Sequence, residues 1–198
     1  LITSLPNING RFLQIDAGAN TDCTPLNLVQ FALMAEVFAS CLMNIESPRI
    51  GLLSVGGEAG KGNDLTKETY KILSQMPINF VGNVEGNTIF EGAADILVSD
   101  GFSGNVLLKT SEGLAKLLIH WLKEVLSRNP VRVTGAILAK NAFKELKMYG
   151  DASEFGGAPL LGINGTLIIS HGASRRRDIR NAVRLASQVG EERIPHIV

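Results

Sequence analysis

Short apolar runs recur along this chain of 198 residues, and each is followed by a loop rich in glycine, asparagine and acidic residues. Helical segments separate the runs. Near-continuous apolar strands that alternate with helices are typical of an α/β protein with a mostly parallel sheet and helices on both faces. Ligands of such sheets bind beyond the carboxyl ends of the strands. We expect one α/β domain over residues 1–198, with strands at 11–16, 49–55, 78–81, 95–98 and 166–170 and five loops facing one crevice.

The helices are expected from apolar spacing and capping signals. Thr24 and Pro25 mark the start of a helix over residues 26–43, and a shorter helix is expected over 65–75. A final helix rich in arginine follows residue 174. The polar, proline-containing residues 1–9 are interpreted as an irregular approach to the first strand.

A helical hairpin is expected over residues 105–148, where it interrupts the alternation. Its first helix, over 106–126, has an apolar stripe that we interpret as core packing. Asn129 and Pro130 end that pattern, and a second helix is expected over 132–148. The tip is either an ordinary exposed turn or a contact with a membrane surface or partner. The stripe consists of Leu107, Leu114, Leu118, Trp121 and Val125.

Composition limits the possible functions. The 19 basic and 19 acidic residues cancel, which gives no reason to expect nucleic-acid binding. Cys23 and Cys41 lack metal-ligand spacing and suit a reducing compartment. The chain has no uninterrupted apolar run of about 18 residues and no secretory pattern at its start, so a cytoplasmic protein is expected.

The loop GGEAGKGND, residues 56–64, is typical of a phosphate-binding loop because it follows a strand, precedes a helix and combines glycines with Lys61. It is not a nucleotide-binding Walker motif, since Val55 replaces the first glycine and Gly62 follows the lysine. Lys61 would then offer a positive charge to a phosphate or thioester oxygen. The alternative is a solvated loop lysine. A dinucleotide fingerprint is also absent from the sequence.

The stretch SDGFSGN, residues 99–105, ends an apolar strand and begins the long helix. Its glycines allow a close backbone approach, and the helix N-terminus behind it favours an anion. The alternative is a plain strand-to-helix turn capped by Ser103 or Asn105.

His171 follows the last expected strand, where a base would be useful, but a structural hydrogen bond at the strand end is the preferred interpretation. The carboxylates of the loops show no metal-site spacing, and no serine-hydrolase elbow occurs in the sequence. No cofactor is expected.

Together these loops resemble one family, the bacterial phosphate acyltransferases of fatty acid and phospholipid synthesis (the PlsX family). The resemblance covers the whole chain and about the C-terminal three-fifths of the family's proteins, so an N-terminal region is expected to be missing. Gly57 departs from the family, which usually has threonine there. The motifs, in order, are DAGANTD, RIGLLSVGGEAGKGND, INFVGNVEG, DILVSDGFSGNVLLKTSEG, EFGGAPLLG and IISHGAS.

The resemblance implies transfer of a fatty acyl group from acyl carrier protein to inorganic phosphate. It places the family's catalytic lysine on Lys61 and its catalytic asparagine on Asn105. It further implies a fold similar to phosphotransacetylases and isocitrate dehydrogenases, a homodimer and peripheral membrane association. Two alternatives stay open: an enzyme that uses acyl-CoA, or a non-catalytic module that binds phosphate or carrier protein. Expected substrate-binding residues are Asn20, Gly60, Gly62, Asn63, Asn83, Asp100, Gly101, Ser103, Gly104 and His171.

Overall fold

The computed structural model describes residues 1–149, 157–170, 172, 174–192 and 194. The chain divides into two compact units. The first, residues Leu1–Asn105 together with Ala152–Val198, contains the sheets, and the second, Val106–Asp151, is helical.

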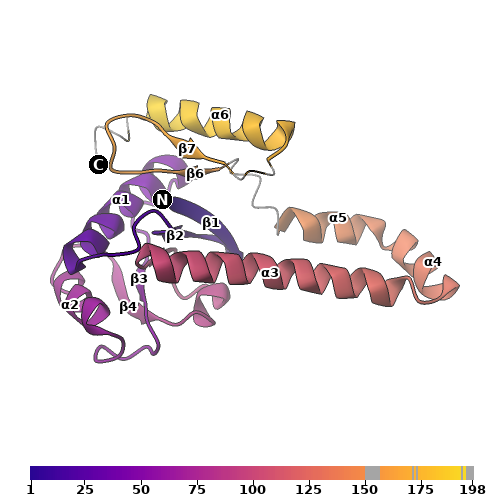
Figure 1. Cartoon of the computed structure of the whole chain (residues 1–198), viewed down its shortest axis with the longest axis horizontal. Coiled ribbons are helices and arrows are strands. Elements are labelled where there is room, and N and C mark those ends of the chain that lie inside the picture. The colour runs from indigo at the N-terminus through magenta and orange to yellow at the C-terminus, as the bar shows by residue number, and fades with distance from the viewer. Residues whose placement is uncertain (150–156, 171, 173, 193, 195–198) are drawn as a thin grey trace. The chain divides into compact units, whose positions relative to one another are not determined.

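The main sheet has five strands in the order β1-β2-β5-β3-β4. Figure 1 labels β1, β2, β3 and β4 of this sheet. The last four are parallel to one another, which confirms the mostly parallel α/β sheet. β1 is antiparallel to β2 and lies where an irregular approach was expected, so that expectation was wrong. Pro6 is tolerated there because β1 is an edge strand. The strands are β1 Ile2–Asn7, β2 Gly10–Ile15, β3 Ile50–Leu53, β4 Phe80–Val84 and β5 Ile96–Val98.

One face of the sheet is covered by α1, Pro25–Met43, which packs with α2, Asp64–Leu73. As expected, Thr24 caps α1: its hydroxyl accepts from the Asn27 amide, and the Asn27 side chain accepts from the Thr24 amide. Among the described helices only α1 has the length and hydropathy of a membrane span. Its inner side is buried in the core, as in a globular domain.

The opposite face carries the 3-10 helix η1, Thr88–Glu91. The ring of Phe90 meets that of Phe12 edge-on, with centroids 5.8 Å apart. The strand expected over residues 166–170 is instead β7, Ile168–Ile169, which pairs with β6, Ala158–Pro159, in a separate antiparallel sheet. The final helix is α6, Arg176–Glu191.

Three helices follow β5 along the chain: α3, Gly101–Leu126, α4, Pro130–Leu138, and α5, Lys140–Tyr149. The second expected helix is therefore broken at Ala139. The expected core packing of the α3 stripe is also wrong, since Leu114, Leu118 and Trp121 are each more than half exposed. Apolar periodicity identifies a face that avoids water, but it does not identify what covers that face.

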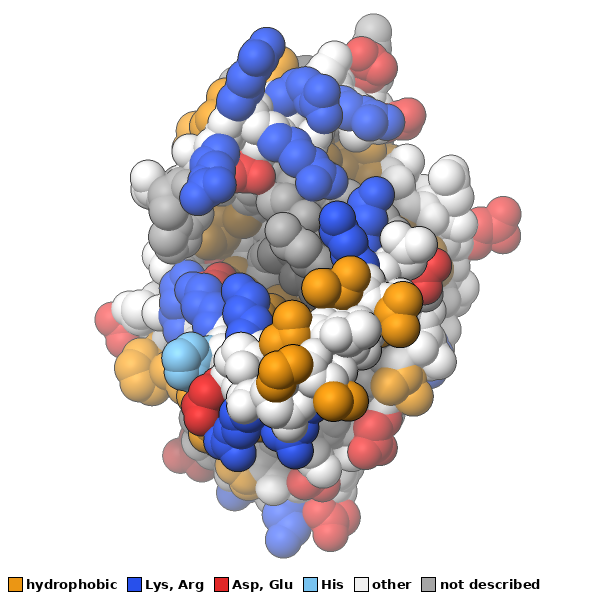
Figure 2. Space-filling view, turned by 90° about the vertical axis from the view of Figure 1, so that its right-hand side faces the viewer, with side chains coloured by type: hydrophobic (Ala, Val, Ile, Leu, Met, Phe, Trp, Pro, Cys, Tyr) orange, Lys and Arg blue, Asp and Glu red, His pale blue; other side chains and the backbone are white. Residues whose placement is uncertain are grey.

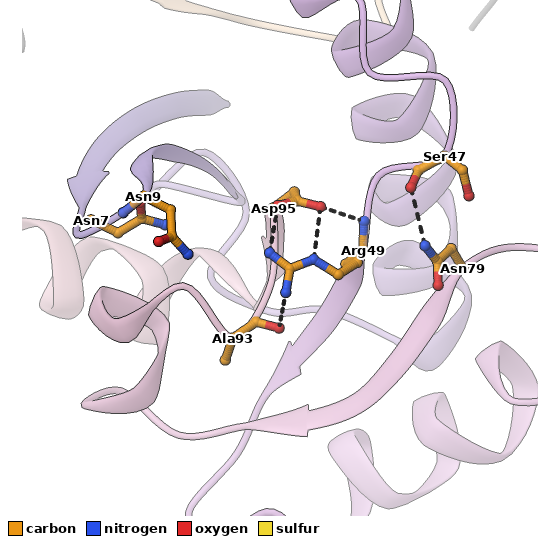
Figure 3. Close-up of polar contacts among 7 residues, drawn as sticks. All are labelled: Asn7, Asn9, Ser47, Arg49, Asn79, Ala93 and Asp95. Carbon is orange, nitrogen blue, oxygen red and sulfur yellow. Dashed lines mark hydrogen bonds and ion pairs between the residues drawn. The ribbon is translucent and has the colours of Figure 1, made fainter.

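A charged pair joins β3 and β5 at their amino-terminal ends. The Arg49 guanidinium donates to both carboxylate oxygens of Asp95, at 3.1 Å from Nε and 2.8 Å from Nη2, and its Nη1 reaches the Ala93 carbonyl (Figure 3). The Arg49 amide also donates to Asp95. Burial raises the pKa of Asp95, but the bonds from Arg49 outweigh it, so the pKa lies below its ordinary value.

We expect Arg49→Met to lower the free energy of unfolding by about 1 kcal/mol at neutral pH, because the pair is partly exposed and screened by water. A depressed carboxyl pKa stabilises the fold above the unfolded-state pKa, and this contribution is lost as the pH falls through the folded-state pKa. The difference between wild type and variant should therefore shrink below a pH of about 4. Urea unfolding at several pH values measures it. Lys109→Met, which breaks the more exposed pair with Glu112, is the control and should have a smaller effect. If Arg49→Met lowered the free energy of unfolding equally at every pH, the lowered pKa of Asp95 would not arise from Arg49.

Candidate active site

Four loops leave the carboxyl ends of the parallel strands at one edge of the sheet. Val98 of β5 pairs with Ile15 of β2 on one side and with Leu52 of β3 on the other. The segment that follows β5 therefore lies between the loops that follow β2 and β3. The fifth expected loop follows β7 in the separate sheet.

Asp16 organises the loop after β2. Its side chain is fully buried, and its carboxylate accepts the backbone N–H groups of Gly18 and Ala19 at 3.1 Å and of Asn20 at 2.6 Å. Burial raises the pKa of Asp16, whereas the backbone N–H bonds from Ala19 and Asn20 lower it. An ionised carboxylate thus folds this loop back onto β2.

The first turn of α3 packs directly against that loop. The Gly101 amide donates to the Asn20 carbonyl at 2.7 Å. A Cβ at Gly101 would lie 2.6 Å from that carbonyl oxygen, and one at Gly104 would collide with the Asp16 carbonyl. One residue further on, the Asn105 side chain lies against Gly18, 3.3 Å from where a Cβ of that glycine would be. The loop after β2 therefore packs against the side-chain amide of Asn105.

Asp100 caps α3, so the alternative that Ser103 or Asn105 is the cap was wrong. Its two carboxylate oxygens accept from the Ser103 amide and hydroxyl, each at 2.8 Å. Because the amides of Gly101 and Ser103 already have acceptors, they are not available to an anion. The exposed Asn105 amide is the polar group that this turn presents.

The loop after β3 presents Lys61, whose side chain is exposed. The Lys61 amide donates to the Glu58 carbonyl at 3.0 Å, which closes a turn. Within the part of the chain that the structure describes, the backbone N–H groups of Gly57, Ala59 and Gly60 have no acceptor. Free amides beside a lysine are the groups that bind a phosphate.

Two asparagines hold this loop in place. Asn63 caps α2 by accepting from the Thr66 amide at 2.9 Å. Asn83 lies within β4 and not in the loop beyond it; its side chain is buried and donates to the Glu58 carbonyl at 2.7 Å. Both are therefore positioned to support the Lys61 turn. Gly62 lies in the left-handed region, with φ of +100°, where a side chain would be strained.

Several groups near the site carried no signal of their own in the sequence. The Ser54 and Ser99 hydroxyls come directly after β3 and β5, are buried, and have no partner among the described residues. Burial raises the pKa of the Cys23 thiol, so this cysteine is not set up as a thiolate nucleophile. The only indication of these hydroxyls in the sequence was that a serine directly follows each of the two apolar runs.

The expected site residues thus form two groups. Asn20, Asp100, Gly101, Ser103, Gly104 and Asn105 meet around the first turn of α3. Gly60, Lys61, Gly62, Asn63 and Asn83 belong to the Lys61 loop and its supports. Among the described contacts none joins Lys61 to Asn105, and His171 lies outside the described residues.

The fold defines an α/β protein with a mostly parallel sheet, and the loops at the carboxyl edge of that sheet form its candidate site. Residues 1–196 match the family described as fatty acid synthesis protein. The chain belongs to this family, which confirms the resemblance found from its loops.

Curated relatives named phosphate acyltransferase are similar to the chain over most of its length. The proteins of Elusimicrobium minutum, Acidobacterium capsulatum and Campylobacter jejuni (strain RM1221) are 49%, 48% and 48% identical over 93%, 95% and 100% of the chain. The chain spans 54%, 56% and 60% of their lengths. A solved phosphotransacetylase, EutD of Staphylococcus aureus, matches 59% of the chain and 43% of its own, with 12% identity and a TM-score of 0.44.

Gly104→Ala should lower the free energy of unfolding by about 1–3 kcal/mol, because the added methyl group would collide with the Asp16 carbonyl. Gly113→Ala in the same helix is the matched control. Nothing lies within 4 Å of a Cβ there, so it should be neutral or stabilise by up to about 1 kcal/mol. Chemical denaturation measures the free energy of unfolding of both variants. Equal values would rule out the close contact between Gly104 and the Asp16 carbonyl.

Proposed function

We propose that this chain carries the reaction site of an enzyme that transfers a fatty acyl group from acyl carrier protein to inorganic phosphate, in phospholipid synthesis. One observation carries the proposal: the Lys61 loop, with its free amides, and Asn105 follow strands that pair with each other, β3 and β5. An anion and a polarised carbonyl would thus be held at neighbouring strand ends. The relatives' name, phosphate acyltransferase, supports the same chemistry.

Lys61 would bind the phosphate. Its ammonium group is a compact charge on an exposed, movable side chain, and the amides of Gly57, Ala59 and Gly60 add neutral donors beside it. This arrangement offsets the charge of the phosphate as it approaches the thioester carbonyl. The Asn83 side chain, which donates to the Glu58 carbonyl, would hold the turn that carries Lys61 in place.

Asn105 would stabilise the charge that develops on the thioester oxygen. A phosphate oxygen forms a bond to the carbonyl carbon, the carbon–sulfur bond breaks, and the carrier's thiolate leaves and takes up a proton. During this step the Asn105 amide donates to the carbonyl oxygen, where a fixed donor lowers the barrier. Because phosphate is itself the nucleophile, no acyl-enzyme is required, which agrees with the raised pKa of Cys23.

Lys61→Ala and Asn105→Ala should each lower kcat by about 10²- to 10³-fold, the usual loss for an electrostatic donor to the transition state. Both side chains are exposed, so circular dichroism and thermal unfolding should be unchanged. The assay follows phosphate-dependent release of the carrier thiol from palmitoyl carrier protein, in natural full-length protein whose intact mass is compared with the 21.2 kDa of this chain. Lys71→Ala and Asn87→Ala are exposed controls.

Either variant retaining full turnover would remove that residue from the mechanism. Palmitoyl-CoA is tested beside palmitoyl carrier protein. Preference for the CoA thioester would favour the alternative acyl-CoA enzyme, and phosphate binding without turnover would favour the non-catalytic module.

We also propose that the helices of Val106–Asp151 mediate a homodimer and peripheral attachment to the cytoplasmic face of a membrane. Besides the α3 stripe, Val131 and Leu138 of α4 are each 82% exposed. Arg128 and Arg132 lie in the same segment, and Figure 2 shows hydrophobic side chains beside Lys and Arg on one face. Apolar side chains next to basic ones suit an anionic lipid surface.

Val131→Glu should lower the partitioning of the protein onto phosphatidylglycerol vesicles by about tenfold, because it removes an exposed apolar side chain that would enter the lipid surface and adds a negative charge that the anionic lipid repels. Thr110→Glu, exposed on α3 and outside α4, changes the charge equally and should have little effect. Vesicle sedimentation measures both. Equal binding by both variants would exclude α4 as the attachment site, and the molar mass from light scattering tests the dimer separately.

A further inference from the structure

An apolar groove lies between α1 and the segment with Leu161 and Gly162, in the unit that contains the candidate site. Its volume is about 470 Å³, within the range of small-molecule sites. Phe31, Met34 and Val37 of α1 line it together with Leu161, and Asn20 and Gln30 supply its polar groups. No Lys, Arg, Asp or Glu is among the described residues that line it. The groove therefore suits an uncharged, apolar ligand.

Asn20 connects the groove to the candidate site. This residue lines the groove, and its carbonyl accepts the Gly101 amide in the first turn of α3, one turn before Asn105. The same loop contacts the Asn105 side chain through Gly18. Asn20 therefore belongs both to the wall of the groove and to the loop that contacts the turn presenting the amide.

The strand order separates the groove from the anion loop. β5 lies between β2, whose loop leads to Asn20, and β3, whose loop carries Lys61. A ligand in the groove and an anion at Lys61 would therefore approach Asn105 from its two sides. A thioester with its carbonyl at Asn105 would have its acyl chain on the α1 side.

We propose that this groove binds the hydrocarbon chain of the acyl donor and sets the preference for long chains. The inference rests on the proposed acyl transfer. A chain lying over Phe31 and Met34 would exclude water from apolar surface, and the amides of Asn20 and Gln30 would lie at the polar end. A Cβ added at Gly162 would lie 3.2 Å from the Met34 sulfur, so these two residues are close together in the wall of the groove.

The test fills the groove with Val37→Trp and compares palmitoyl and acetyl carrier protein as donors. Because even one methylene in an apolar pocket changes kcat/KM by about tenfold or more, kcat/KM for the palmitoyl donor should fall at least that far. Turnover of the acetyl donor should stay unchanged, since Lys61 and Asn105 are untouched. Leu26→Trp, on the exposed side of α1 and outside the groove, is the matched control and should alter neither donor.

The outcomes separate the two proposals. If wild-type protein transfers neither donor to phosphate, the proposed function fails. If wild-type protein transfers both donors and Val37→Trp keeps the wild-type ratio of palmitoyl to acetyl activity, the groove does not bind the acyl chain and the proposal is overturned. That result is expected if residues outside this chain, or a second copy of it, cover the groove. A folded Val37→Phe variant with an intermediate ratio supports the proposal where the tryptophan variant does not fold.

Discussion

The buried carboxylate of Asp16 is the interaction on which the ligand edge of the sheet depends. A charge without exposed surface is tolerated only when it is paired or hydrogen-bonded, and Asp16 accepts three backbone amides of its own loop. These bonds place the Asn20 carbonyl where it receives the Gly101 amide. One ionised side chain thus links the end of β2 to the start of α3. It also holds Gly18 in the position where this residue contacts the Asn105 side chain.

This arrangement requires glycine at two positions of one helical turn. Gly101 and Gly104 are three residues apart, so they lie on the same face of α3, and that face meets the Asp16 loop. The close approach is what directs Asn105 outward. Asp100 completes the turn by taking the Ser103 amide, which leaves the side chain of Asn105 as the available donor. The pair of glycines that first indicated an anion-binding turn therefore has mainly a packing role.

Local signals account for what the sequence predicted correctly. Four of the strands were predicted correctly because each is a short apolar run. The polar residues that follow two of these runs identified the loops with Lys61 and Asn105. β1 was missed because its strand character comes from pairing with β2. Asn83 was misplaced because the pairing of Leu52 with Asn83 extends β4 past the expected end. The stripe of α3 has the same periodicity whether its own chain or another surface covers it.

The strand order bears on how the proposed site would hold two reactants with opposite solvation. Phosphate is stabilised by charge and amides, whereas a hydrocarbon chain is stabilised by the absence of both. A single pocket would compromise one of them, because apolar walls desolvate the anion and charged walls keep water around the chain. The insertion of β5 between β2 and β3 puts the apolar groove and the Lys61 loop on different strands. Asn105 follows β5, the strand that lies between β2 and β3. The carbonyl of a bound thioester would therefore have to meet the anion at Asn105.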